Sequence, residues 1–330
     1  MLPLQYSSPL SNVILLSRKE LYMNKKHVAV IGAAGQVGTP LTKGLLSLGH
    51  QVTIIFRAHN AQNDAKLTEF ETLGATLVEC PDMKNVNALA KALRGVDTFV
   101  ASVPGSKEII REFEPLWLEA AVKAGVKRFV PTEFGAHTQA LEMGDGEIFD
   151  QKKRFHDQLM NSSLDWTLFY NGGIFDYFLP NLRFFSKITT FGDLNIPIYT
   201  HDIEDIGYLA AMAVTDDRTV NRCVQLDYNA LTQNEMLTQI KQNWPDTPFE
   251  YEHFSTEYII EQKESSGDEI TAKKGSETDK ERWGINYVIY VIDKLAAFTD
   301  QTLRASEIYP DYVCKRPQDA LKDEKFIFEG

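Results

Sequence analysis

The chain has 330 residues, of which 43% are hydrophobic, and a formal net charge of −12. This length and composition are typical of a globular protein with a substantial buried core. A strongly acidic chain lacks the basic surface that replaces the counterions of a phosphate backbone, so the charge argues against a nucleic-acid partner. The same charge disfavours an anionic membrane surface as a partner.

Cysteine and histidine usage argues against a disulfide framework and against a metal site. Cys80, Cys223 and Cys314 lie far apart, and the sequence has no C-x-x-C pair. The seven histidines show no ligand-like spacing, so we expect no metal. No apolar stretch of the sequence is long enough to span a bilayer. These features predict reduced thiols in a cytoplasmic protein with no membrane partner.

The first residues are expected to lie outside the folded domain. Met23 begins a short polar segment directly before the first predicted strand and is a natural start for the domain. The apolar run at residues 13–16 is too short for the core of a signal peptide. We therefore interpret residues 1–24 as a disordered N-terminal extension.

A glycine-rich turn follows the first predicted strand. Residues 27–38, HVAVIGAAGQVG, join an apolar strand to a helix predicted over residues 40–48. Glycines in such a turn let the backbone bend tightly and approach a pyrophosphate. The spacing is G-x-x-G-x-x-G instead of the commoner G-x-G-x-x-G, and a tight turn with nothing bound is the alternative. The loop residues expected to contact a dinucleotide are Gly32, Ala34, Gly35, Gln36, Val37 and Gly38.

Arg57 follows the second predicted strand, residues 51–56. Sites that prefer NAD carry Asp or Glu at this place, where the carboxylate accepts hydrogen bonds from the ribose 2′-hydroxyl. An arginine offers a permanently charged fork that suits a phosphate, so Arg57 favours NADPH over NADH. The alternative is a solvated arginine at the end of a strand.

Helical and strand patterns alternate after residue 57. Helices are predicted at residues 67–73, 86–93 and 113–124, and strands at 75–80, 98–103 and 128–131. This alternation is typical of a doubly wound parallel sheet, the Rossmann-like α/β class, whose ligands bind beyond the carboxyl ends of the strands. The residues expected to contact the cofactor at that edge are Ser102, Val103, Thr132 and Phe134. Asp82 lies at the same edge, where a plain loop carboxylate is an equally good interpretation.

Several stretches carry a resemblance to a known family. They are KRFVPTEFG at residues 127–135, F-x-x-K at 149–152, YFLP at 177–180 and ASEIYPD at 305–311. Together with the glycine-rich turn they resemble the isoflavone reductase-like branch of the NmrA-like, atypical short-chain dehydrogenases, from about residue 25 onward. The resemblance implies an NADPH-dependent reductase of a small aromatic substrate, similar to phenylcoumaran benzylic ether reductases and eugenol synthase-like enzymes.

The resemblance also implies a role for Lys152, the lysine of F-x-x-K. In that family this lysine lies beside the nicotinamide and acts as the acid/base, and it is expected to do both here. A lysine that is partly desolvated, or flanked by other cations, can exchange a proton more readily. The alternative is an amphipathic helix that buries Phe149, Phe155 and Leu159 and turns its basic residues to water.

A further strand, predicted at residues 164–170, leads into a second cofactor segment. The resemblance places the backbone of this segment near the nicotinamide, through Gly172, Gly173 and Ile174. The family commonly has an asparagine one position after Asn171, so the chain departs from the pattern there. Tyr170, Tyr177 and His156 are candidate phenol or imidazole partners, but each is expected instead to be a buried aromatic side chain that hydrogen-bonds to the backbone.

The C-terminal part is expected to contain helices at residues 231–243 and 286–298, separated by a charged segment. Residues 261–282 are rich in charge, Ser and Gly, which predicts a long exposed loop, with a mobile lid as the alternative.

These observations divide the chain into an NADP-binding domain, residues 25–170, and a mainly substrate-binding α/β lobe, residues 171–330, with some segments returning to the Rossmann-like sheet. The working protein is expected to be a monomer or homodimer. Two other functions remain open: a non-catalytic NADP(H)-binding redox sensor, and a reductase of quinones or other xenobiotics. Fold similarity alone does not separate them.

Overall fold

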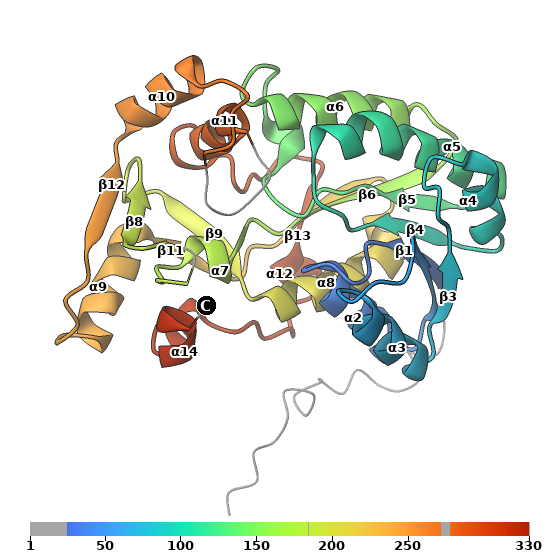
Figure 1. The fold of residues 1–330 in the computed structure, drawn as a ribbon, viewed down its shortest axis with the longest axis horizontal. Helices are drawn as coiled ribbons and strands as arrows, with labels where there is room; N and C mark the ends of the chain where they lie inside the picture. Colours follow the sequence, from blue (N-terminus) through green and yellow to red (C-terminus); the bar gives the residue numbers. More distant parts are fainter. Residues whose placement is uncertain (1–24, 184, 272–277, 330) are drawn as a thin grey trace, which may run out of the picture.

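The computed structural model describes residues 25–183, 185–271 and 278–329. The extension expected at residues 1–24 lies outside this part. The largest element is an eight-stranded sheet in the order β13-β10-β6-β5-β4-β1-β2-β3, and all of its pairings are parallel (Figure 1). Its strands are β1 (His27–Ile31), β2 (Gln51–Phe56), β3 (Thr76–Glu79), β4 (Thr98–Ala101), β5 (Arg128–Val130), β6 (Asp165–Tyr170), β10 (Arg222–Gln225) and β13 (Thr302–Arg304).

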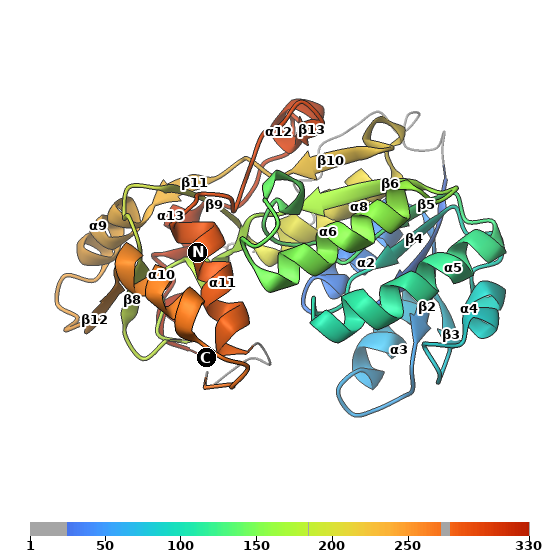
Figure 2. The ribbon, with the colours of Figure 1, turned by 90° about the horizontal axis from the view of Figure 1, so that it is seen from above.

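Helices cover both faces of this sheet (Figures 1 and 2). One face carries α4 (Val86–Ala92), α5 (Glu114–Ala124) and α6 (Glu147–Met160), and the other carries α2 (Gly38–Ser47), α3 (Asp64–Thr72) and α8 (Ile203–Thr215). The period of two along β1 explains the two layers, because Ala29 and Ile31 face one hydrophobic core while Val28 and Val30 face the other. The expected doubly wound α/β class is confirmed.

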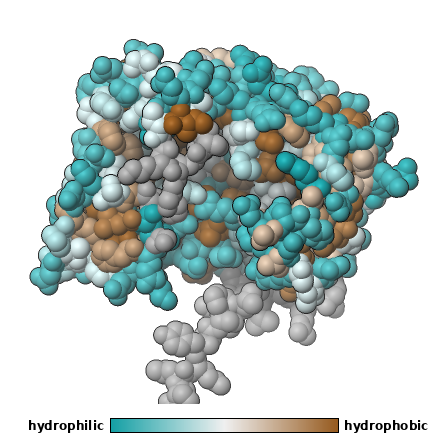
Figure 3. Space-filling view, in the orientation of Figure 1, coloured by the Kyte–Doolittle hydropathy of each residue, from teal (hydrophilic) through white to brown (hydrophobic). Residues whose placement is uncertain are grey.

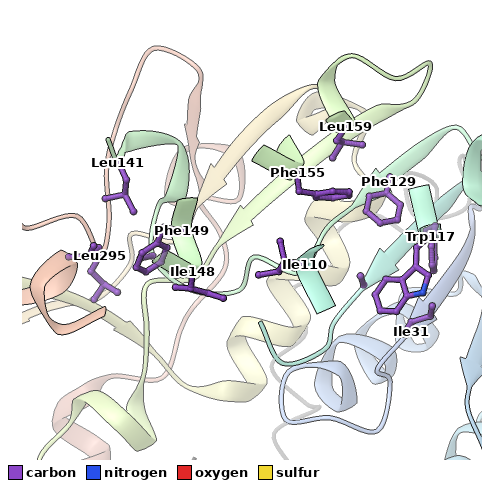
Figure 4. Packing of buried hydrophobic residues seen from close by; sticks show 14 of the residues in the cluster. Ile31, Ile110, Trp117, Phe129, Leu141, Ile148, Phe149, Phe155, Leu159 and Leu295 are labelled. Atoms are coloured by element: carbon purple, nitrogen blue, oxygen red, sulfur yellow. The ribbon is translucent and has the colours of Figure 1, made fainter. Parts of the chain in front are cut away.

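The core beneath α5 and α6 combines aliphatic side chains with large aromatic ones (Figure 4). Phe155 on α6 lies against Phe129 on β5, with ring centroids 6.0 Å apart and the rings edge to face. Trp117 on α5 is buried in the same cluster and donates its indole N–H to the carbonyl of Met83. Burial on this scale fixes α6 against the sheet, which matters for the side chains that α6 presents.

A second lobe lies beside the large sheet, at the left in Figure 1. It contains β7 (Gly173–Ile174), β9 (Pro197–His201) and β11 (Ala230–Thr232) in one small sheet, and β8 (Ile188–Phe191) with β12 (Tyr251–Phe254) in another. Its helices and turns are α7 (Phe175–Phe178), α9 (Gln233–Asn243), α10 (Thr256–Ser265), α11 (Asp279–Tyr290), α13 (Pro317–Ala320) and α14 (Glu324–Phe328). Between these segments the chain returns to the large sheet as β10 and β13, and the short helix α12 (Ala305–Ile308) follows β13.

The predicted loop at residues 261–282 is wrong at both ends. Residues 261–265 belong to α10 and residues 279–282 to α11, while 272–277 lie outside the described residues. Both helices begin at side-chain caps, Ser255 for α10 and Thr278 with Glu281 for α11. The α10 helix buries Ile259, and α11 buries Trp283, Val288, Ile289 and Tyr290, so a charge-rich sequence forms helices with a packed apolar face.

Two further boundaries differ from those predicted. Residues 230–232 form β11, which pairs with β9, so the helix predicted from residue 231 begins only at Gln233. Thr232 caps that helix in a capping box with Glu235. The helix predicted over 286–298 is instead the end of α11, which stops at Tyr290, shortly before Asp293 takes a positive φ of 52°.

Polar side chains cover most of the face shown in Figure 3, and apolar side chains form small separate areas on it. Among the described residues, no helix is both long enough and apolar enough to cross a bilayer.

Candidate cofactor and reaction site

The glycine-rich turn closes tightly onto the end of β4. Gly32 has a φ of +84°, and a Cβ atom on it would lie 2.1 Å from the carbonyl oxygen of Ser102. A Cβ on Gly38 would lie 2.0 Å from the carbonyl oxygen of Gly32. Side chains at these two positions would therefore collide with backbone. The turn forms a cradle of bare backbone in which a pyrophosphate could approach the N–H groups of the loop.

A groove runs along this cradle with about 770 Å³ of empty space that opens to solvent. Its walls come from the carboxyl ends of β1, β2 and β4 and from the loops that follow them. The predicted cofactor residues among its lining are Gly32, Ala34, Gly35, Arg57, Ser102 and Val103. The groove thus lies where ligands of doubly wound sheets bind.

The groove is electropositive at the end of β2. Arg57 is exposed there, and Lys66 on α3 donates from Nζ to the carbonyl oxygen of Ala34 at 2.8 Å. The α2 helix points its N-terminus at the same loop, and within this fully described helix the first turn holds no acidic residue. Helix N-termini and basic side chains both attract phosphate. The sequence analysis did not single out Lys66. The pattern that could have indicated it is a lysine in the first turn of a helix shortly after Arg57.

Gln36 joins the glycine-rich loop to the second lobe. The hydroxyl of Tyr177, on α7, donates a hydrogen bond to Gln36 Oε1 at 2.8 Å. Tyr177 is 44% exposed, so the expectation of a buried tyrosine bonded to backbone is wrong for it. Val37, the next residue, is the N-cap of α2.

Lys152 is buried on α6, with only 7% of the residue exposed. Its Nζ donates to the carbonyl oxygen of Glu133 at 2.9 Å and lies 3.6 Å from Glu133 Oε2. Arg154, two positions further along the helix, is exposed. The alternative in which the basic side chains of this helix face water is therefore wrong for Lys152, because an anionic partner compensates its burial.

The Lys152 ammonium adjoins the segment that follows β4. A Cβ atom on Gly105 would lie 3.8 Å from Lys152 Nζ, and the preceding residue, Pro104, lines the groove. Thr132, at the end of β5, donates from its hydroxyl to the carbonyl of Val103 at 2.5 Å. The structure thus brings the predicted residues of β4, β5 and α6 to one edge of the sheet.

Phe134 and the segment after β6 lie at the same edge, although they do not line the groove. Phe134 has a φ of 37° and donates its backbone N–H to the carbonyl of Phe169 at 3.2 Å. Gly172 has a φ of +66°, and its Cβ would lie 2.5 Å from the carbonyl oxygen of Tyr199. Gly173 and Ile174 follow it as β7. The side chain of Asn171, the departure from the family pattern, is buried and donates to the carbonyl of Gly172.

Glu133 and His156 form a buried pair beneath Lys152. His156 Nε2 lies 2.7 Å from Glu133 Oε1, so the expectation of a backbone partner for this histidine is also wrong. Burial by itself would raise the pKa of Glu133. The charge of Lys152 and the hydrogen bonds from His156 and Thr138 to the carboxylate outweigh burial and lower this pKa to about 2.

Glu114, at the start of α5, has a raised pKa where Glu133 has a lowered one. Its carboxyl is fully buried and accepts the backbone N–H of Thr132 at 2.8 Å. Burial, with a smaller contribution from the nearby Glu133 charge, raises the pKa of Glu114 to about 8. At neutral pH the Glu114 side chain is therefore a neutral acid beside the anionic Glu133.

A sequence model of the NmrA-like family matches residues 24–295. The chain belongs to this family. Phenylcoumaran benzylic ether reductase of Ginkgo biloba is 30% identical over 234 residues, which are 65% of this chain and 74% of that protein. A bifunctional pinoresinol-lariciresinol reductase of Linum usitatissimum is 26% identical over 321 residues, 91% of this chain and 99% of that protein.

The fold agrees with that of a solved structure of similar sequence. The structure described as AtPrR2 with NADP+ and (+)pinoresinol has a TM-score of 0.75 and is 26% identical, covering 90% of this chain and 98% of that one. The resemblance to the isoflavone reductase-like branch, drawn from the motifs of the sequence, is confirmed.

Proposed function

We propose that this NmrA-like protein is an NADPH-dependent reductase of a small aromatic, phenylpropanoid- or isoflavonoid-like substrate, in which Lys152 exchanges a proton with the substrate. One observation carries the proposal: a buried ammonium group held by a carboxylate lies at the edge of a glycine-cradled groove. The reductase class agrees with the names of the relatives reported above, and the AtPrR2 structure contains NADP+.

The residues of the groove fit a dinucleotide phosphate. The backbone cradle at Gly32 and Gly38 has room for a pyrophosphate only because no Cβ occupies it. Arg57 and Lys66 supply positive charge at the end of β2, where the 2′-phosphate of NADPH would lie. When bound, the cofactor supplies the hydride.

Lys152 supplies the proton. Two polar partners of its ammonium group belong to Glu133, which leaves a donor for a substrate oxygen at the groove. In the reduction of a benzylic ether, the carbon–oxygen bond breaks, the carbon gains the hydride and the oxygen leaves as a phenol with the proton from Lys152. Burial of the ammonium keeps bulk water away from this transfer.

The second lobe is proposed to hold the aromatic ring. At Gly173 a Cβ atom would lie 2.5 Å from the ring of Phe178, so this glycine lets an aromatic side chain lie directly against the backbone. The two curated relatives named above act on phenylcoumaran benzylic ethers and on pinoresinol or lariciresinol, as their names state. An aromatic ether or isoflavonoid is therefore the first substrate class to test.

The test is NADPH oxidation, followed optically, against phenylpropanoid ethers, isoflavones, aromatic aldehydes and quinones, with NADPH binding titrated by fluorescence. Lys152→Met should keep NADPH binding and lose about 100-fold or more in turnover, the usual contribution of a general acid. Lys123→Met, on the exposed side of α5, is the matched control and should retain turnover. Full turnover by Lys152→Met would remove Lys152 from the mechanism. Tight NADPH binding without turnover on any panel member would favour the redox-sensor function, and turnover of quinones alone would favour a xenobiotic reductase.

The remaining expectations belong to the same proposal. We expected some segments after residue 170 to return to the large sheet. The strands β10 and β13 do so, which supports a division near residue 170 into interleaved domains. Light scattering tests the monomer or homodimer, and cell fractionation tests the cytoplasmic location.

A further inference from the structure

Glu133 holds an unusual position for a charged side chain. Its carboxylate is almost completely buried, with a side-chain exposure of 2%, and both oxygens are occupied. Oε1 accepts from His156 at 2.7 Å, while Oε2 accepts from the Thr138 hydroxyl at 2.7 Å and faces Lys152 Nζ at 3.6 Å. A buried carboxylate is costly unless its charge and lone pairs are satisfied, and here they are.

We propose that Glu133 is a positioning residue for Lys152: its backbone carbonyl and its carboxylate together fix the ammonium group at the groove and keep it charged until the proton is transferred. The inference rests on the proposed function, because it concerns how the acid/base lysine is held in place. His156 supports this arrangement, because its hydrogen bond to Glu133 Oε1 fixes the orientation of the carboxylate.

The geometry of α6 supports the view that Lys152, His156 and Glu133 act as one unit. Lys152 and His156 are four residues apart on α6, so both side chains project from one face toward Glu133. Gln139 Nε2 lies 2.6 Å from His156 Nδ1, which leaves the Nε2 proton of the ring to be donated to Glu133. The orientation of the carboxylate is thereby set from outside the groove, independently of any ligand.

The other titratable groups around the pair do not compete as anions at neutral pH. Glu114 on α5, with its pKa raised to about 8 by burial, is a neutral acid. His137, after β5, is uncharged because burial lowers its pKa to about 4. Tyr170, at the end of β6, keeps its proton because burial raises its pKa well above the ordinary value. Among the described groups that face this cluster, Glu133 therefore supplies the negative charge next to Lys152.

The first test reads the charge of Lys152 without substrate or cofactor. The protein is pulse-labelled with acetic anhydride over a range of pH, and acetylation of each lysine is followed by peptide mass spectrometry. Only the amine form reacts, so the labelling midpoint of Lys152 reports how strongly the ammonium is held. Glu133→Gln should move this midpoint to lower pH by about one unit, the usual effect of losing a close opposite charge. Lys123 in the same sample should label as before.

Thr138→Val is the matched variant, because it removes one hydrogen bond to Glu133 Oε2 and leaves the carboxylate charge in place. It should leave the labelling midpoint of Lys152 unchanged. A purely structural disturbance of the cluster would instead shift this midpoint in both variants alike. Thermal unfolding and NADPH titration check that each variant is folded. If Glu133→Gln does not fold, Glu133→Asp takes its place: a retained charge at greater distance should give a smaller shift in the same direction.

Turnover on the substrate panel gives the second reading. Glu133→Gln should lower kcat about tenfold or more with NADPH affinity unchanged, and should move the alkaline limb of the pH–rate profile to lower pH. A folded Glu133→Gln variant with the parental labelling midpoint and the parental pH profile overturns the inference. If Lys152→Met retains full turnover, the proposed function falls and this role of Glu133 falls with it. Loss of turnover in Lys152→Met, with Glu133→Gln unchanged, overturns the role of Glu133 alone.

Discussion

Tyr177 and Gln36, which are 141 positions apart in the chain, are joined by a hydrogen bond of 2.8 Å from the tyrosine hydroxyl to Gln36 Oε1. The contact connects α7 of the second lobe to the loop between β1 and α2. We therefore expect the bond to couple the second lobe to the loop that is predicted to hold the cofactor.

Tyr177→Phe removes the hydroxyl and keeps the ring. A hydrogen bond of this kind contributes about 0.5–1.5 kcal/mol, so the dissociation constant of NADPH should rise about 2- to 10-fold. Fluorescence titration measures the change. Tyr251→Phe, on the exposed strand β12, is the control and should bind NADPH as the parent does. Equal affinities for all three proteins would show that the bridge does not retain the cofactor.

Arg57→Asp should reverse the electrostatics at the end of β2. Loss of a charged contact and introduction of a like charge should weaken NADPH binding by about 10-fold or more, while NADH, which lacks the 2′-phosphate, should lose far less. Arg222→Asp, on an exposed residue of β10, makes the same change in net charge away from the groove. Isothermal titration with both cofactors gives the comparison. Equal losses for NADPH and NADH would contradict the role assigned to Arg57.

The sequence predicted the fold correctly where local pattern and tertiary structure agree. The alternation of strands and helices between His27 and Tyr170 follows from periodicity, and β1 divides its side chains between the two cores as a period of two requires. The glycine spacing likewise located a cradle whose geometry depends on Gly32 and Gly38. Charge composition misled the prediction at α10 and α11, where caps and a single buried face outweighed the polar character of the segment.

The sequence could predict only part of the candidate site. Motif resemblance singled out Lys152, but its burial depends on Glu133, which lies 19 residues away along the chain. The bridge from Tyr177 to Gln36 and the contact of Lys66 with the Ala34 carbonyl also join distant segments. No local periodicity encodes such contacts, since they arise only when the sheet is assembled. The roles of the predicted site residues stay predictions until the variants are measured.

Gly32→Ala should unfold the cradle locally and abolish NADPH binding. The new Cβ would lie 2.1 Å from the carbonyl oxygen of Ser102, so β1 and β4 must separate, at a cost of about 1–3 kcal/mol beyond the strain of a positive φ. Gly74→Ala is the matched control, because Gly74 also has a positive φ, +101°, but its Cβ would meet nothing within 4 Å. Denaturant unfolding and NADPH titration should show a smaller loss of stability and normal binding for the control. Normal binding by Gly32→Ala would contradict the cradle.

Glu114→Gln should stabilise the protein by an amount that grows with pH. The unfolded carboxyl ionises near its model value of 4.5, whereas burial raises the pKa of the folded carboxyl to about 8. Between these values the folded state binds more protons than the unfolded state, so the parent loses stability as pH rises, by at most about 1.4 kcal/mol per pH unit. Glutamine keeps an oxygen for the Thr132 N–H and has no proton to lose.

The difference in unfolding free energy between Glu114→Gln and the parent should therefore be flat below about pH 4.5, rise between about pH 4.5 and 8, and level off above that range. Urea unfolding at a series of pH values measures it. Glu119→Gln, on the exposed side of the same helix, should show no such rise. A difference that falls as pH rises would mean that Glu114 is held as an anion in the folded protein, and the neutral acid beside Glu133 would then be wrong.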